Sequence, residues 1–305
     1  MAIIDDKSNI CVSFILKGIQ VHKERYAADS NPPPFFLGVN GIQGAGKSTL
    51  VSTLYSVLQS EPYGLATVVL SIDDLYLTHA DQKQLASSNS SNPLLQHRGQ
   101  PSTHDLVLGT SVFTSLRQYL PTKIPRYDKS AFNGQGDRVD ESEWDVVNAL
   151  GQEKIKVVIF EGWCVGFRPL QQDVIEAKWL AAKEARENGI YIGQLGYNRL
   201  QDIIAINQAL KGYNVLTDQL DALIHIDAED PQYVYQWRLE AEHVLHRTRG
   251  SGMTNDEVKQ FVDGYYPAYE VFTETLREGI FKPDIGRQLR LVIGQDRKIK
   301  QVLKD

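Results

Sequence analysis

The sequence predicts an α/β fold with a mainly parallel β-sheet, and two features of its apolar residues support this. Short, continuous apolar runs alternate along the 305 residues with longer segments whose apolar positions recur at helical spacing. Continuous apolar runs are typical of strands that helices cover on both faces. The chain shows no internal repeat and no linker, so we expect one domain over residues 1–305.

The expected elements follow in chain order. Apolar residues at helical spacing predict a helix over residues 9–28, within an N-terminal region (1–34) that ends in three prolines. Strands are expected at residues 35–39, 67–72, 156–160, 220–227 and 289–293. Further helices are expected at residues 50–59, 104–119, 170–187, 197–211, 231–249 and 255–277, two of them in a helical insertion (163–215). Residues 86–103 and 121–143 are expected to be long loops, which usually carry function in compact domains.

A glycine-rich motif follows the first expected strand. Residues 41–49 read Gly-Ile-Gln-Gly-Ala-Gly-Lys-Ser-Thr, which matches G-x-x-x-x-G-K-[ST] between a strand and a helix. The glycines let the backbone turn tightly and point N–H groups at an anion, and the helix directs its positive end there. Lys47 is expected to reach the β/γ-phosphates of a nucleotide, and Ser48 to ligate Mg²⁺. The expected nucleotide-binding residues are Gly41, Gln43, Gly44, Ala45, Gly46, Lys47, Ser48 and Thr49.

Acidic residues end the next two expected strands. Glu161 follows an apolar strand as a Walker B acid does, and is expected to hold Mg²⁺ directly or through water. Asp73 and Asp74 follow the strand at 67–72. Ligands bind beyond the carboxyl ends of parallel strands, so we expect Asp73 to act there as general base on an acceptor hydroxyl. The sequence leaves open which of the two aspartates faces the acceptor and which caps the loop.

Polar and cationic side chains crowd the two expected loops and the segments beside them. A guanidinium group binds a carboxylate through two hydrogen bonds, so this composition favours a small anionic acceptor. Taken singly, each of these residues is equally well explained as a solvated charge or as a partner in an ion pair within its loop. The candidate acceptor-binding residues are Asp74, Tyr76, Arg98, His104, Arg126, Tyr127, Asp128 and Arg168, with Lys129 and Arg138 nearby.

Composition excludes several classes of function. A net charge of −6 and a pI near 5.7 argue against non-specific binding of nucleic acid or of an anionic membrane. The two cysteines, Cys11 and Cys164, are far apart and fit reduced intracellular thiols better than a disulfide or a zinc site. With no secretory signal and no apolar run of membrane-spanning length, we expect a cytoplasmic protein, the nucleus remaining open. Oligomeric state is unknown from the sequence, which is compatible with a monomer.

Motifs along nearly the whole chain resemble the P-loop kinases that include phosphoribulokinase, uridine kinase and pantothenate kinase, and most closely D-glycerate 3-kinase and its fungal relatives. They are GIQGAGKST at 41–49, SIDDLYLTH at 71–79, RGQPSTHD at 98–105, PRYDKSAFNGQGDR at 125–138, FEGWCVGFRP at 160–169, and WRLEAEHVL with GMTNDEVKQFVDGYYPAY within 237–269. The resemblance implies a P-loop NTPase three-layer sandwich with sheet order 2-3-1-4-5 and a base at Asp73. It also implies a helical lid (231–255) that brings Arg238, or else Arg247 or Arg249, near the transferred phosphate. ATP and Mg²⁺ are the implied cofactors.

The sequence therefore predicts an ATP-dependent small-molecule kinase with an acceptor such as D-glycerate. A nucleoside or pantothenate-type kinase, and a non-catalytic ATP-binding regulatory protein, are the alternatives. A GTPase switch is disfavoured because Glu161 is not followed by D-x-x-G and because the chain contains no N-K-x-D guanine signature. The joint presence of Lys47, Ser48, Asp73 and Glu161 argues against loss of turnover.

Overall fold

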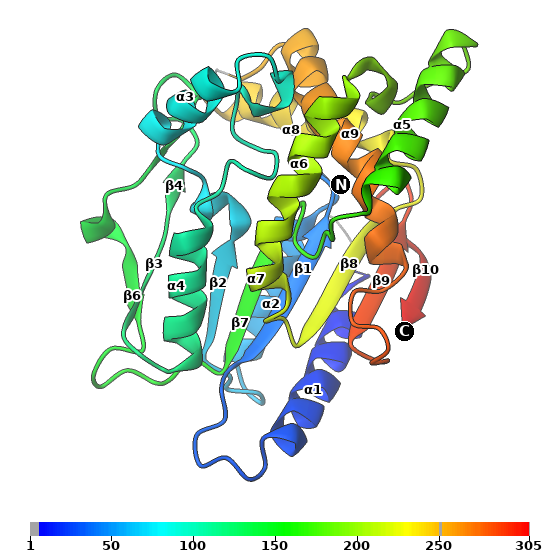
Figure 1. Cartoon of the computed structure of the whole chain (residues 1–305). Helices are drawn as coiled ribbons and strands as arrows, with labels where there is room; N and C mark the ends of the chain where they lie inside the picture. Colours follow the sequence, from blue (N-terminus) through cyan, green and yellow to red (C-terminus); the bar gives the residue numbers. More distant parts are fainter. Residues whose placement is uncertain (1–5, 250–251, 305) are drawn as a thin grey trace.

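The chain forms an α/β sandwich around one six-stranded sheet. A computed structural model describes residues 6–249 and 252–304 (Figure 1). The strand order is β10-β9-β8-β1-β7-β2, and all neighbours pair in parallel except β10, which is antiparallel to β9. In chain order the parallel strands follow 2-3-1-4-5, so the predicted sheet order is confirmed. The strands are β1 (Phe35–Gly41), β2 (Thr67–Ser71), β7 (Val157–Gly162), β8 (Ala222–Ala228), β9 (Gln288–Ile293) and β10 (Ile299–Lys304).

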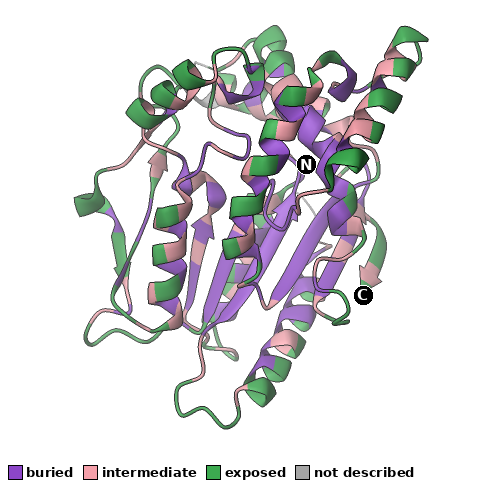
Figure 2. Cartoon of the chain, in the orientation of Figure 1, coloured by how far each residue is buried: buried purple, intermediate pink, exposed green. Residues whose placement is uncertain are grey.

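Helices cover both faces of this sheet, as the continuous apolar runs predict (Figures 1 and 2). One face packs against α1 (Ser8–Arg25) and α2 (Lys47–Gln59), and the other lies under α4 (Leu106–Arg117), α6 (Leu200–Leu210), α7 (Asn214–Thr217) and α9 (Asn255–Arg277). The central strands are buried along their length, whereas the outward helix faces are exposed. Beyond the carboxyl ends of the strands lie α3 (His79–Ser88), α5 (Gln172–Glu187) and α8 (Tyr233–Arg249).

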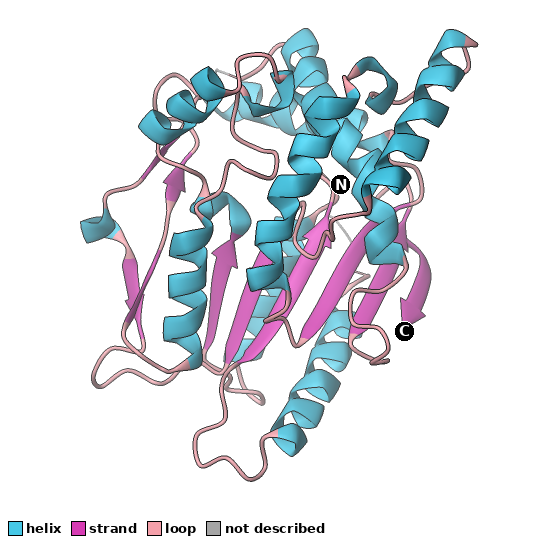
Figure 3. Cartoon of the chain, viewed as in Figure 1, coloured by secondary structure: helices cyan, strands magenta, loops and turns pink. Residues whose placement is uncertain are grey.

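The five parallel strands end at one edge of the sheet, where their arrowheads gather in Figure 3. The register pairs Ser71 of β2 with Glu161 of β7, and Gly162 of β7 with Asn40 of β1. The segments that follow β1, β2 and β7 therefore begin side by side. This edge positions the glycine-rich loop next to both acidic strand ends.

The two expected long loops contain regular structure, so that expectation is wrong in part. The first contains the end of α3 and a 3₁₀ turn, η2 (Pro93–Leu95). The second contains three short strands and η3 (Glu141–Glu143), and a fourth short strand follows it. These strands form two small hairpins, which pair β3 (Thr122–Ile124) with β6 (Asp145–Val147), and β4 (Tyr127–Asp128) with β5 (Asp137–Arg138). Strands of two or three residues are too short to leave a periodic pattern in the sequence.

Strand β10 was not predicted either. Its residues, Ile-Lys-Gln-Val-Leu-Lys, lie at an open edge of the sheet and are mostly exposed, so they form no continuous apolar run. Among the described residues, the structure contains no helix with the length and hydrophobicity needed to cross a membrane.

Candidate active site

The glycine-rich segment forms an anion cradle at the start of α2. Gly44 and Gly46 have φ angles of +80° and +93°, a backbone region that favours glycine. Helix α2 begins at Lys47, and no described side chain caps its first turn, so its N–H groups are available to an anion. The loop is held from outside by Arg297, whose Nε donates to the Gly44 carbonyl at 2.8 Å.

Lys47, Asp73 and Glu161 share the edge beyond β1, β2 and β7. Loss of hydration lowers the pKa of the Lys47 ammonium, while the carboxylates of Glu161 and Asp73 act in the opposite direction. This coupling places both acids close to the lysine that is expected to bind phosphate. Ser48, the next residue, is exposed on the first turn of α2. The structure therefore brings together four residues that the sequence predicts for ATP and Mg²⁺.

The two adjacent aspartates have different surroundings. Asp74 accepts hydrogen bonds from the backbone N–H groups of Ser71 (3.3 Å) and Tyr127 (3.2 Å), and so caps the 3₁₀ turn η1 (Ile72–Leu75). Burial raises the pKa of Asp74 to about 6. Asp73 instead lies at the edge of the sheet where β1, β2 and β7 end, which we call the catalytic edge, and its Oδ2 lies 2.5 Å from the Lys129 Nζ. Burial raises the pKa of Asp73, but the Lys129 ammonium, together with His104 and the Tyr76 hydroxyl, outweighs that effect and leaves the pKa lowered.

An aromatic wall lies beside Asp73. The His104 ring stacks on Tyr76 at 4.5 Å, and its Nδ1 lies 2.6 Å from the Tyr213 hydroxyl. Burial lowers the pKa of His104 to about 4, so the ring is neutral at pH 7. The Tyr76 phenol interacts with the Asp73 carboxylate and with the Tyr265 phenol. The sequence does not reveal these contacts, because Tyr213 lies next to α7 and Tyr265 lies on α9, both far along the chain from His104 and Tyr76.

Trp163, which follows β7, continues this wall. Its ring contacts those of Tyr265 and Tyr269 edge-on, at 5.0 and 5.6 Å. The indole Nε1 of Trp163 and the Nε2 of His104 are buried and have no hydrogen-bond partner among the described residues. Most buried polar atoms in folded proteins are hydrogen-bonded, so two such atoms on one wall mark a surface suited to a polar ligand.

Two other predicted acceptor-binding residues stabilise the hairpin loop at 129–136. The Arg98 guanidinium donates to the carbonyls of Gly134 (2.8 Å) and Gln135, and lies over the Tyr127 ring. Asp128 accepts from the N–H and hydroxyl of Ser130, at 2.8 and 2.6 Å. The polar atoms of both residues are therefore used within this loop.

The structure does not bring Arg126 or Arg168 to Asp73. Arg126 is exposed and lies 3.6 Å from Asp145 of β6. Arg168 binds Asp218 at 2.6 Å and the Asn214 side chain at 2.9 Å, both beside α7.

Arg238, the arginine predicted for the lid, forms its ion pair with a residue of the same helix. Arg238 of α8 lies 2.5 Å from Glu242 and over the Phe261 ring, at 5.1 Å from its centroid. Its neighbour Trp237 packs directly against Gly44 of the glycine-rich loop. Arg247 is exposed, and the side chain of Arg249 lies outside the described residues, as do residues 250 and 251 of the expected lid.

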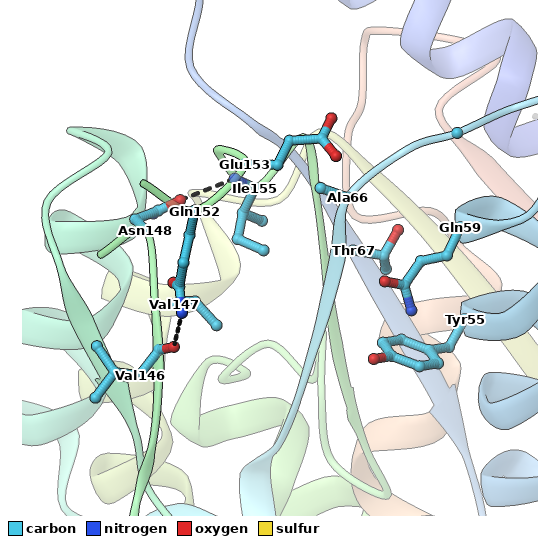
Figure 4. Close-up of a pocket in the computed structure, with 11 residues that line it drawn as sticks. Tyr55, Gln59, Ala66, Thr67, Val146, Val147, Asn148, Gln152, Glu153 and Ile155 are labelled. Atoms are coloured by element: carbon cyan, nitrogen blue, oxygen red, sulfur yellow. Dashed lines mark hydrogen bonds between the residues drawn. The ribbon is translucent and has the colours of Figure 1, made fainter. Parts of the chain in front are cut away.

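A cavity of about 360 Å³ lies away from this edge, at the amino ends of β2 and β7 (Figure 4). It is lined by Tyr55, Gln59, Gly64, Ala66, Thr67, Val146, Val147, Asn148, Gln152, Glu153 and Ile155. None of the predicted site residues is among them.

Comparisons with known proteins agree with this geometry. No family model matches the chain. The chain is 38% identical over 245 residues to the "uncharacterized kinase mug58" of Schizosaccharomyces pombe, covering 80% of this chain and 82% of the relative. It is 30% identical over 305 residues to the "probable ATP-dependent kinase TDA10" of Saccharomyces cerevisiae, covering 95% and 94%. A solved D-glycerate 3-kinase from Cryptococcus neoformans superposes with a TM-score of 0.88 at 35% identity, over 98% of this chain and 99% of that one.

Proposed function

The chain belongs to the D-glycerate 3-kinase-like P-loop kinases, which makes it an ATP-dependent small-molecule kinase, and we propose that its phosphoryl acceptor is D-glycerate. The observation that carries the proposal is the ion pair between Lys129 and the Asp73 carboxylate, which also acts electrostatically on Lys47. One lysine serves the phosphates and the other lies where an anionic acceptor would bind. Similarity to the D-glycerate 3-kinase structure supports the same acceptor.

In this mechanism the backbone N–H groups of the glycine-rich loop bind the β- and γ-phosphates, and Lys47 neutralises their charge. Asp73 accepts the proton of the acceptor hydroxyl. The hydroxyl oxygen forms a bond to the γ-phosphorus while the bond between that phosphorus and the β,γ-bridging oxygen breaks. The electron pair of the broken bond leaves on the β-phosphate of ADP. Phosphoryl transfer of this kind needs no covalent intermediate with the protein. Orientation of the acceptor hydroxyl by Asp73 and neutralisation of the phosphate charge by Lys47 therefore provide most of the catalysis.

The donor set also fits Mg²⁺. Ser48 offers a hydroxyl oxygen next to Lys47 on α2, and Glu161 offers a carboxylate from β7. Mg²⁺ prefers oxygen ligands and is usually bound through one or two protein oxygens together with substrate phosphates. When bound, the ion would neutralise charge that develops on the phosphates.

The aromatic wall suits a small polar acceptor. Neutral His104, Trp163 and the phenol of Tyr76 provide hydrogen-bonding groups at the side of Asp73. Enclosure by this wall would also exclude water, which otherwise competes with the acceptor for the γ-phosphoryl group.

A coupled ADP-release assay tests the proposal. Purified protein with Mg·ATP is given D-glycerate, uridine, pantothenate, glycerol or no acceptor, and the product is identified by phosphorus NMR. We expect turnover with D-glycerate well above all the others. Faster turnover with uridine or pantothenate than with D-glycerate would show that the faster substrate, and not D-glycerate, is the acceptor. ATP binding without turnover on any acceptor would identify a regulatory protein instead.

A further inference from the structure

Lys129 forms an ion pair with a carboxylate oxygen of Asp73, the proposed base. Its Nζ lies 2.5 Å from Asp73 Oδ2, and both a Coulomb attraction and a hydrogen bond join them. A carboxylate held in this way is a poor acceptor for a proton, because protonation would break the ion pair. Asp73 therefore becomes an effective base only when the ammonium moves away.

The loop that carries Lys129 is fixed at both ends. The backbone N–H of Tyr127 donates to Asp74, and β4 pairs with β5 across the base of the loop. Within the loop, Arg98 donates to the carbonyls of Gly134 and Gln135. The main chain at residue 129 is thus anchored beside η1.

The side chain of Lys129, by contrast, is free to change partner. It is 59% exposed, against 25% for the Asp73 side chain. A lysine stem has four rotatable carbons, and an exposed ammonium loses little when it exchanges one carboxylate for another. The structure therefore provides an anchored loop and, on it, an exposed ammonium paired with a carboxylate that is less exposed.

The other cations have contacts of their own. The Lys47 Nζ donates to the Ile42 carbonyl of the glycine-rich segment at 3.5 Å, and Arg98 donates to the Gly134 carbonyl. Arg126, Arg138 and Arg168 pair with Asp145, Asp105 and Asp218. Among the cationic side chains that the sequence nominates for the acceptor, Lys129 is the one that the described structure places in contact with Asp73. An acceptor carboxylate near Asp73 would meet this ammonium first.

We propose that Lys129 is a specificity-determining gate: it holds Asp73 in an ion pair until the carboxylate of the acceptor takes the ammonium, which binds the acceptor and frees the base in one exchange. This inference rests on the proposed function, since it names the residue that recognises the anionic acceptor of that site. Once freed, Asp73 takes the hydroxyl proton, and the acceptor oxygen attacks the γ-phosphorus as ADP leaves with the electron pair. Water and neutral polyols carry no carboxylate, so they leave the ion pair in place.

The gate is tested by Lys129→Met and Lys129→Arg in the full-length protein. Methionine keeps the length of the stem and removes the charge, so Asp73 is permanently free. We expect acceptor-independent ATP hydrolysis to rise several-fold above wild type. We also expect the KM for D-glycerate to rise about 10- to 100-fold, as for loss of a charged hydrogen bond, with the KM for ATP unchanged. Lys129→Arg keeps a cation and should retain both low hydrolysis and acceptor affinity.

Lys123→Met is the matched control. Lys123 is an exposed lysine of β3 that pairs with Glu141, so its loss changes net charge equally but should alter neither measurement. Hydrolysis by Lys129→Met at or below the wild-type rate would overturn the gate. So would a fall in kcat with an unchanged KM for D-glycerate, which would assign Lys129 to the phosphates. If wild type fails to use D-glycerate, the proposed function fails, while the hydrolysis measurement still decides whether Lys129 restrains the base.

Discussion

Two glycines of the glycine-rich loop allow a quantitative test of how helix α8 packs on that loop. At Gly44 (φ +80°) an added Cβ would lie 2.4 Å from the Trp237 Cβ and 3.2 Å from its carbonyl carbon. At Gly46 (φ +93°) an added Cβ would meet no atom within 4 Å. Alanine at either position has the same type of backbone strain, but only Gly44→Ala also forces α8 away from the loop.

The expected losses of stability differ accordingly. Left-handed backbone costs an alanine about 1–2 kcal/mol, which is the full expected effect of Gly46→Ala. Overpacking adds about 1–3 kcal/mol, so Gly44→Ala should lose about 2–5 kcal/mol. The free energy of unfolding is measured by urea titration without nucleotide, with equal m-values showing that the two variants unfold comparably. Equal losses in the two variants would refute the contact between Trp237 and the loop.

Three further predictions concern the catalytic edge. Lys47→Met should abolish phosphoryl transfer, because the phosphates lose their buried cation; normal turnover would remove Lys47 from the mechanism. Asp74→Asn should lower stability by about 1–2 kcal/mol while retaining most of kcat, since Asp74 binds backbone N–H groups; a loss of kcat equal to that of Asp73→Asn would exchange the roles of the two acids. Burial lowers the pKa of His104 from 6.5 to about 4, so between these pH values the unfolded chain binds a proton that the folded chain does not. The free energy of unfolding should therefore fall between pH 7 and pH 4, by about 3 kcal/mol more in wild type than in His104→Gln. Urea titrations at the two pH values measure this fall, and an equal fall in both proteins would contradict the prediction.

Most of the architecture was predictable because it depends on local patterns. Apolar runs mark β1, β2, β7, β8 and β9, since β1 and β8 are buried along their length and the other three are buried at most positions. Their order came from the resemblance and is confirmed by the pairing. Edge strand β10 and the hairpins of residues 122–147 were missed, because exposed or very short strands need no apolar run.

The candidate site was only partly predictable. The glycine-rich motif, Asp73 and Glu161 are marked by their place after strands, and the register brings those strand ends together. Sequence spacing does not encode which side chains meet across 56 residues, so the pairing of Lys129 with Asp73 was not evident. For the same reason the sequence predicts Arg168 as an acceptor-binding residue, although the fold directs it to Asp218 beside α7. The sequence indicates Lys129 only as one cation among several, and its position in the PRYDKSAFNGQGDR motif is the available signal.

We propose that Asp73 is the base that acts on the acceptor while the glycine-rich loop binds the nucleotide. A comparison of wild type with Asp73→Asn decides this, using isothermal titration for ATP affinity and phosphorus NMR for formation of phosphoglycerate. We predict that ATP affinity is retained and that kcat for D-glycerate falls by about 10²- to 10⁴-fold, the usual contribution of a general base. An Asp73→Asn protein that phosphorylates D-glycerate at the wild-type rate would contradict the account.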